Sequence, residues 1–293
     1  MIQKFLDYLS VEKRYSSLTV KSYAKDLADF QIFLLDTESS GDLVNVQKVM
    51  LRNFIVDLSK RNYSKRSINR KISALKSFYI FLLKVGEITV NPIESISLLK
   101  FYPEKQIPMS VDEMQHLEQI FETKNDYLGE CIVELLYQTG IRKAELCNLL
   151  TDSVDFSKLE ILVNGKGNKM RIIPISEKLE TKLQRYFNNE RKSLTENDMY
   201  FFVSKKGKKL NEKFVYSVVN FYLGLVTLKK KKSPHILRHT FATQVLENGA
   251  EISKVKKIMG HSSLASTQVY TSANIEQMKK ILNAAHPRGK KIE

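Results

Sequence analysis

The stretch from Ser233 to Tyr270 constrains the fold most, because residues that start and end helices follow one another there at short intervals. Ser233 is a favourable N-cap, and Pro234 suits the first position of a helix. Gly249 and Gly260 can each adopt the left-handed conformation that ends a helix. The sequence therefore predicts a succession of short helices whose ends lie close together.

Four side chains at the ends of these helices form a candidate site. His235 and Arg238 are three residues apart, so both lie on one face of the first turn. Unpaired N–H groups and the helix dipole favour a phosphate at that end. His261 follows the second helix directly, and a serine behind it can cap a third helix that carries Tyr270. The group is cationic and aromatic and contains no carboxylate.

The net charge points to a polyanionic partner. The chain has 293 residues, enough for two domains with cores of their own. Its formal charge is +15, and a field of that sign steers and holds nucleic acid. The alternative reading of the charge alone is a basic protein that is merely soluble.

Membrane insertion and secretion both fit the sequence poorly. Apolar runs such as residues 78–83 are far shorter than the roughly 20 residues that span a bilayer. The first residues resemble an amphipathic helix that carries acids, not a signal peptide. Cys131 and Cys147 provide neither a disulfide framework nor a metal-site spacing, and we expect Cys131 to be buried. We therefore expect a reducing cytoplasm as the setting.

The periodicity divides the chain into two domains. Residues 1–98 carry apolar residues at helical spacing, with helices expected over residues 2–14, 18–35, 46–61 and 64–85. Residues 99–107 lack periodicity and are the predicted linker. The second domain, 108–293, begins with a capping box formed by Ser110 and Glu113.

A cationic stripe marks the last helix of the first domain. Between residues 60 and 84 there are eight lysines or arginines and no acid, whereas a solvated helix face usually mixes both signs. We predict that Lys65, Arg66, Arg70 and Lys71 contact DNA, mainly at its phosphates. A purely solvated face is the alternative.

Within the second domain, the spacing of apolar residues changes from a helical pattern to that of short strands. A helix over residues 126–138 is closed by Gly140, and Arg142 opens the next. Two β-rich runs, 160–163 and 170–175, then flank a glycine-rich turn with Lys166 at its tip, which predicts a β-hairpin. The turn leads into a strand and not a helix, so it lacks the context of a nucleotide-binding loop.

These residues suit the cleavage of a phosphodiester by a tyrosine. Phosphoryl transfer depends on positioning and on stabilising charge, and fixed cations can do the work of metal ions. Two-metal nucleases need a carboxylate cluster, which the candidate site lacks. A tyrosine has a pKa near 10, so it needs a base or nearby positive charge to react.

The ordered set of motifs resembles the tyrosine recombinases of the phage integrase family. The matching segments are Thr139 to Leu146, Gly165 to Lys169, His235 to Ala242, and Met259 to His261 followed by Tyr270. The resemblance covers the whole chain. It implies a mainly α-helical fold with a small β-sheet: a four-helix, SAM-like core-binding domain and an α+β catalytic domain.

The resemblance also implies a mechanism and a role for each matching residue. Tyr270 attacks the scissile phosphate and forms a 3′-phosphotyrosyl intermediate, while Arg142 and Arg238 hold the non-bridging oxygens. Lys166 is the general acid toward the 5′-oxygen. The two histidines, His235 and His261, bind the phosphate or handle the tyrosine proton. No metal ion, ATP or other cofactor is implied, and Glu145 is expected to support the site structurally.

Within the family, residues 283–288 resemble the end of the Xer recombinases, which resolve chromosome dimers in chromosome partition before cell division. The implied partners are a double-stranded DNA recombination site and a homo- or hetero-tetramer (a dimer of dimers). A paralogous recombinase and a DNA translocase (FtsK-like) are further candidates. The C-terminal helix, residues 275–285, would dock on a neighbouring protomer. The implied location is the nucleoid in the cytoplasm, with no membrane contact.

Three other functions stay open from the sequence. A mobile-element integrase of the same family would use the same residues for DNA integration. A type IB topoisomerase would use the same chemistry without strand exchange. A DNA-binding accessory protein would lack catalysis, and its signature would be a missing nucleophile or arginine, but none is missing.

Overall fold

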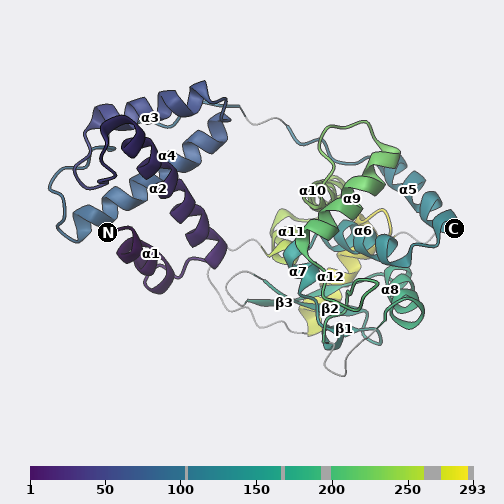
Figure 1. Ribbon diagram of the computed structural model, residues 1–293. Helices are drawn as coiled ribbons and strands as arrows, with labels where there is room; N and C mark the ends of the chain where they lie inside the picture. The colour runs from purple at the N-terminus through teal and green to yellow at the C-terminus, as the bar shows by residue number, and fades with distance from the viewer. Residues whose placement is uncertain (103–104, 166–168, 193–198, 261–271, 290–293) are drawn as a thin grey trace. The chain divides into compact units, whose positions relative to one another are not determined.

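The computed structural model describes residues 1–102, 105–165, 169–192, 199–260 and 272–289, and the chain divides into two compact units (Figure 1). The first unit covers residues 1–104 and the second covers residues 105–293. None of the helices within the described ranges combines the length and the apolar composition that crossing a bilayer requires.

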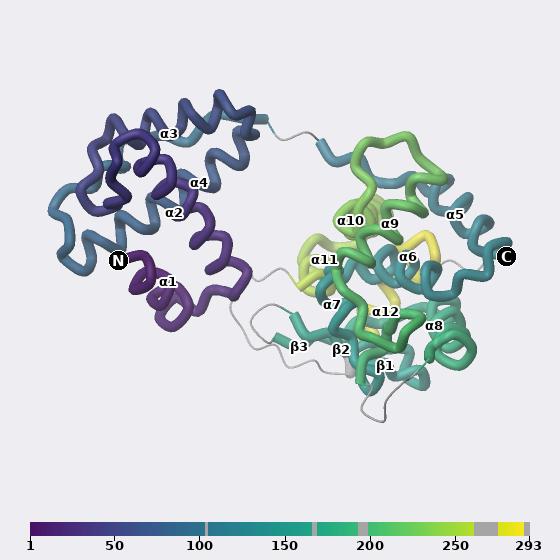
Figure 2. The backbone as a smooth tube through the Cα atoms, viewed as in Figure 1, coloured from purple at the N-terminus to yellow at the C-terminus, as the bar shows by residue number. Residues whose placement is uncertain are grey.

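The N-terminal unit consists of helices, as the sequence predicted. They are α1 (Ile2–Val11), α2 (Ser17–Glu38), α3 (Lys48–Lys60) and α4 (Lys65–Lys84), and Figure 2 traces them as the purple and blue part of the tube. Ser16 and Ser64 cap α2 and α4 by accepting hydrogen bonds from backbone N–H groups of the first turn. The first helix ends earlier than expected, and the chain turns at Arg14, where φ is positive.

Aromatic side chains from all four helices make up the centre of this unit. Phe5 meets Phe78 edge to face, with ring centroids 5.3 Å apart. Phe30 and Phe54 join α2 to α3 at 4.9 Å. All four rings are at most 2% exposed. Such pairs stabilise a fold beyond the apolar area that they bury.

The prediction that Lys71 contacts DNA is wrong, because Lys71 belongs to this core. Its side chain is 2% exposed, and its ammonium pairs with Asp26 at 3.1 Å and also with Asp29. A buried ammonium with two carboxylate partners cannot reach a phosphate. The acids that α4 lacks come from α2, 45 and 42 residues earlier in the chain.

The C-terminal unit contains a small sheet beside a helical body. Its strands are β1 (Val154–Asp155), β2 (Glu160–Asn164) and β3 (Met170–Pro174), antiparallel in the order β1-β2-β3. The predicted hairpin is confirmed as β2 and β3, with Val163 opposite Arg171. The sequence analysis did not predict β1, which is only two residues long.

Eight α-helices and one 3₁₀ turn lie within the described part of this unit. They are α5 (Val111–Lys124), α6 (Tyr127–Thr139), α7 (Lys143–Cys147), the 3₁₀ turn η1 (Thr151–Ser153), α8 (Glu177–Asn189), α9 (Glu212–Val226), α10 (Pro234–Glu247), α11 (Ile252–Met259) and α12 (Ser272–Ala285). The predicted capping box of Ser110 and Glu113 is present at the start of α5. The polar helix α8 was not predicted, because few of its residues are apolar.

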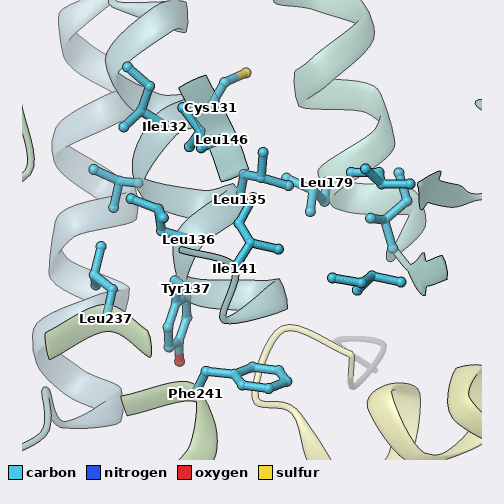
Figure 3. Packing of buried hydrophobic residues seen from close by; sticks show 14 of the residues in the cluster. Cys131, Ile132, Leu135, Leu136, Tyr137, Ile141, Leu146, Leu179, Leu237 and Phe241 are labelled. Atoms are coloured by element: carbon cyan, nitrogen blue, oxygen red, sulfur yellow. The ribbon is translucent and has the colours of Figure 1, made fainter. Parts of the chain in front are cut away.

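Helix α6 forms the centre of the unit. Every residue from Leu128 to Thr139 is buried, and α8, α9 and α10 pack around the helix. Figure 3 shows Leu135 and Tyr137 of α6 among side chains of α7, α8 and α10. Cys131 is buried as predicted, and burial raises the pKa of its thiol. Because α6 is buried on all sides, the helices around it all pack against one common element.

The C-terminal helix packs onto its own unit. Helix α12 lies against β3 and α10, and Met278 and Leu282 are buried in the same core as α6. The sequence analysis predicted that the helix carrying these two side chains docks on a neighbouring protomer. Both side chains are buried within the chain, because α12 packs against β3 and α10.

A buried charge cluster fastens the tail behind α12. The Arg288 guanidinium pairs with Glu134 at 2.9 Å and with Glu118 at 2.5 Å. Lys182 of α8 adds a second cation beside Glu130 and Glu134. Burial alone would raise the pKa of Glu134, but Arg288 and Lys182 outweigh it and lower that pKa to about 2.

We therefore expect a pH-dependent loss of stability in Glu134→Gln. At pH 7 the variant should unfold about 3–5 kcal/mol more easily, because two buried cations lose a carboxylate. The lowered folded-state pKa means that this stabilisation is full above the unfolded value, about 4.3, and is lost as the pH falls toward 2. The difference between the two proteins, measured by urea denaturation, should narrow along that range.

Glu212→Gln is the matched control. Its ion pair with Lys143 is about two-fifths exposed on both sides, so its removal should change stability by less than about 1 kcal/mol. A constant difference between wild type and Glu134→Gln from pH 7 to pH 3 would contradict the assignment.

Candidate active site

Arg142 stands at the N-cap of α7, where Glu145 holds it twice. Glu145 accepts a hydrogen bond from the Arg142 backbone N–H at 2.8 Å and another from its guanidinium at 2.9 Å. A second guanidinium nitrogen donates to the carbonyl of Gly260 at 3.2 Å. The side chain remains 38% exposed. The guanidinium is therefore oriented by the protein but still open to a ligand.

Arg238 approaches the same place from the first turn of α10. It is buried and donates to the carbonyl of Met259 at 2.7 Å and to the carbonyl of Gly140. Desolvation and then the positive charge of Arg142 lower the pKa of Arg238 to about 10. Two guanidinium groups thus meet at the carbonyls that end α11, and a bound anion would relieve their repulsion.

His235 lies on α10, three residues before Arg238. The residue is exposed, but partial desolvation of its ring and then the charge of Arg238 lower its pKa from the ordinary value. Its neutral ring can donate or accept a proton near pH 7. His239 has a different role, because its ring contacts the carbonyl of Gln106 at 3.1 Å.

Lys166, His261 and Tyr270 lie outside the described residues. The structure does describe the glycine before each of the first two. Gly165 ends the β2 side of the hairpin and donates its N–H to the carbonyl of Lys169 at 2.8 Å. Gly260 caps α11 in a left-handed conformation, with φ +66°. Arg142, His235 and Arg238 are the predicted catalytic residues that the structure brings together.

Arg171 is a residue of this site that the sequence analysis missed. It lies on β3, is 4% exposed, and forms a bidentate ion pair with Glu145. The available signal was an arginine at an inward-facing register position of a short apolar strand, opposite Val163. A buried arginine of this kind requires a carboxylate partner.

Comparison with known proteins identifies the family. The model of the phage integrase family matches residues 108–277, and that of the phage integrase N-terminal SAM-like domain matches residues 2–86. The chain belongs to the phage integrase family. The tyrosine recombinase XerC of Anoxybacillus flavithermus is 38% identical over 296 residues, which span 97% of this chain and 96% of that protein.

Solved structures share the fold of this integrase-family chain. The Tn1549 transposon integrase superimposes with a TM-score of 0.72 at 20% identity, over 97% of this chain and 99% of that one. The XerH site-specific recombinase superimposes with a TM-score of 0.70 at 21% identity, over 96% of this chain and 83% of that one. The expected fold class, a SAM-like helical domain and a mixed catalytic domain, is confirmed.

Within the parts of the chain that the structure describes, no group of three histidine, cysteine or acidic side chains is arranged to hold a metal ion. Glu145, the carboxylate at the centre of the site, is engaged by Arg142 and Arg171.

Gly140→Ala should disturb both the fold and the site. Gly140 has φ +62°, and an added Cβ would lie 2.6 Å from the buried ring of Phe241. Strain and clash together should lower the unfolding free energy by at least about 2 kcal/mol. The carbonyl of Gly140 also holds Arg238, so the affinity for an anion such as sulfate should fall. Urea denaturation and calorimetric titration measure the two effects.

Gly249→Ala provides the comparison. Gly249 also has a positive φ, but nothing lies within 4 Å of an added Cβ. Its substitution should cost stability through strain alone and leave anion binding unchanged. Equal losses in the two variants would show that the Phe241 contact is unimportant.

Proposed function

We propose that this protein is a Xer-type site-specific recombinase that cuts and rejoins DNA through a phosphotyrosine bond to Tyr270. The convergence of Arg142 and Arg238 on one point, beside the end of α11, carries the proposal. Fixed donors in that arrangement suit the charge that develops on the non-bridging oxygens of a phosphate in transfer.

The chemistry assigns one task to each residue. The Tyr270 oxygen forms a bond to phosphorus while the bond from phosphorus to the 5′-oxygen breaks. Lys166 gives the proton that the leaving 5′-oxygen takes up. Arg142 and Arg238 bind the non-bridging oxygens, and the neutral ring of His235 hydrogen-bonds the phosphate or shares in moving the tyrosine proton. His261 has the same role as His235. Lys166, His261 and Tyr270 enter on the resemblance of their motifs.

The reaction needs neither a metal ion nor ATP. The two guanidinium groups supply the positive charge that divalent ions supply in metal-dependent nucleases. The phosphotyrosine bond keeps the energy of the phosphodiester, so rejoining needs no further source. This feature separates the proposed enzyme from a metal nuclease.

The proposed partner is a double-stranded recombination site held by a tetramer. The Tn1549 integrase was solved in complex with transposon right end DNA, and XerH bound to a palindromic difH substrate. The similarity to a XerC protein over nearly the whole length favours chromosome dimer resolution. A paralogous recombinase and an FtsK-like translocase belong to this proposal. A mobile-element integrase is the second candidate, since the Tn1549 integrase shares the fold.

The N-terminal unit is the proposed DNA clamp. Lys65, Arg66 and Arg70 are exposed on α4, whereas Lys71 is not. Arg70 already pairs with Asp26 at 2.8 Å but remains 48% exposed. Lys65 and Arg66 are therefore the stronger candidates for contacts to DNA phosphates.

A suicide substrate with a nick next to the scissile phosphate tests the chemistry. The wild-type protein should form a covalent protein–DNA adduct in EDTA, visible on a denaturing gel, and Tyr270→Phe should form none. Tyr216→Phe, which changes an exposed tyrosine of α9, should react like the wild type. An adduct that persists in Tyr270→Phe, or that requires magnesium, would sink the proposal.

The salt dependence of DNA binding distinguishes the proposed phosphate contact of Arg66 from the structural role of Lys71. Arg66→Gln should weaken binding and reduce the slope of log K against log salt by about 1, the share of one phosphate contact. Lys71→Met should leave that slope unchanged below its melting temperature but melt earlier, because Asp26 and Asp29 lose their buried partner. An altered slope in Lys71→Met, or an unaltered one in Arg66→Gln, would contradict this division.

A further inference from the structure

Arg171 joins three separate elements with one side chain. Its guanidinium donates to the two carboxylate oxygens of Glu145, at 3.0 and 2.8 Å, and its Nε–H donates to the carbonyl of Ile258 at 2.8 Å. The contacts connect β3 to α7 and to the last turn of α11. Each of these elements leads directly to a residue of the proposed active site.

Two glycines pack against the same guanidinium. A Cβ on Gly165 would lie 3.2 Å from a terminal nitrogen of Arg171, and one on Gly260 would lie 3.1 Å from that nitrogen. The guanidinium is therefore in close contact with the backbone at both glycines. Lys166 follows Gly165 in the chain, and His261 follows Gly260. Arg171 thus fixes the points from which both catalytic candidates extend.

Glu145 transmits the position of Arg171 to Arg142. The oxygen that accepts one bond from Arg171 also accepts the guanidinium of Arg142, and the other oxygen accepts the Arg142 backbone N–H. Burial would raise the pKa of Glu145, but the hydrogen bond from Arg171 and then that from Arg142 lower it. The carboxylate consequently stays charged and holds Arg142.

A purely structural ion pair is the simpler reading of a buried arginine. Lys182 illustrates that role, since its carboxylate partners come from α5 and α6, none of which carries a catalytic candidate. The contacts of Arg171 differ because they converge on Arg142 and on the two glycines beside Lys166 and His261.

We propose that Arg171 is the positioning residue of the active site: it orients Arg142 through Glu145 and sets the backbone at Gly165 and Gly260. In this role Arg171 acts through Glu145 and through the backbone, and it takes no direct part in the chemistry. This inference rests on the proposed recombinase chemistry.

The first test is single-turnover cleavage of the nicked suicide substrate at saturating protein, with DNA affinity measured separately. Arg171→Met should slow adduct formation by about 100-fold, since a shift of about 1 Å in catalytic groups has that effect. Its affinity for the DNA site should stay within about 3-fold of the wild type, because the lost interaction acts in the transition state. Arg171→Lys should form the adduct at a rate between those of the wild type and Arg171→Met.

Lys182→Met is the matched control, because it also removes a buried cation from the same unit and leaves carboxylates unpaired. It should melt earlier than the wild type but cleave at the wild-type rate below its melting temperature. Normal cleavage by folded Arg171→Met would overturn the inference, and so would a slow Lys182→Met.

The double variant Arg171→Met/Glu145→Gln separates positioning from stability. In Arg171→Met the buried Glu145 carboxylate keeps Arg142 but loses its bidentate partner. The double variant removes this poorly compensated charge, so it should melt higher than Arg171→Met. Its cleavage should stay as slow as that of Arg171→Met, because the two residues act as a unit. A cleavage rate that recovers together with the melting temperature would reduce Arg171 to a structural role.

The pH profile gives an independent signature. In Arg171→Met the pKa of Glu145 loses its main lowering contact and rises, so cleavage should fall with decreasing pH earlier than in the wild type. Identical profiles would count against the inference. A wild-type protein that forms no Tyr270-dependent adduct would instead refute the proposed function and is recognised before any variant is compared.

Discussion

The ion pair between Glu145 and Arg171 is the interaction on which the candidate active site of the C-terminal unit depends. Arginine charges are expensive to bury, and they remain buried only where carbonyls and a carboxylate replace water. Glu145 accepts hydrogen bonds from the guanidinium groups of the partly exposed Arg142 and the buried Arg171. The carbonyls at the end of α11 accept further hydrogen bonds from Arg142, Arg171 and Arg238. The helix end and the hairpin are consequently tied to one point.

The C-terminal unit contains two clusters of charged side chains, and the charges are balanced differently in each. Around Glu134, cations and carboxylates pair closely, and the lowered pKa of Glu134 reflects that balance. At the site, desolvation and then the positive charge of Arg142 lower the pKa of Arg238 to about 10, so positive charge is less well compensated there. The first cluster secures the tail behind α12, and the second is prepared for an anion.

The N-terminal unit illustrates where local reasoning fails. The helical periodicity of α4 was sufficient to predict the helix and its buried stripe. The same window suggested an uninterrupted cationic face, but Lys71 lies on the buried side and meets Asp26 and Asp29 of α2. Charge partners that come from a distant helix are invisible to any pattern read along one helix.

The sequence by itself determined most of the helices, the hairpin, the family and the order of the motifs that resemble it, because caps, glycines and periodicity act over a few residues. Helix ends at Gly140 and Gly260 were correctly predicted for this reason. Only the tertiary structure decided which side chains are buried together: Lys71 in the helical core, Arg171 beneath the candidate active site, and Met278 and Leu282 inside their own unit. Those outcomes depend on packing between elements far apart in the chain, where burial and desolvation, and not local propensity, set the energy.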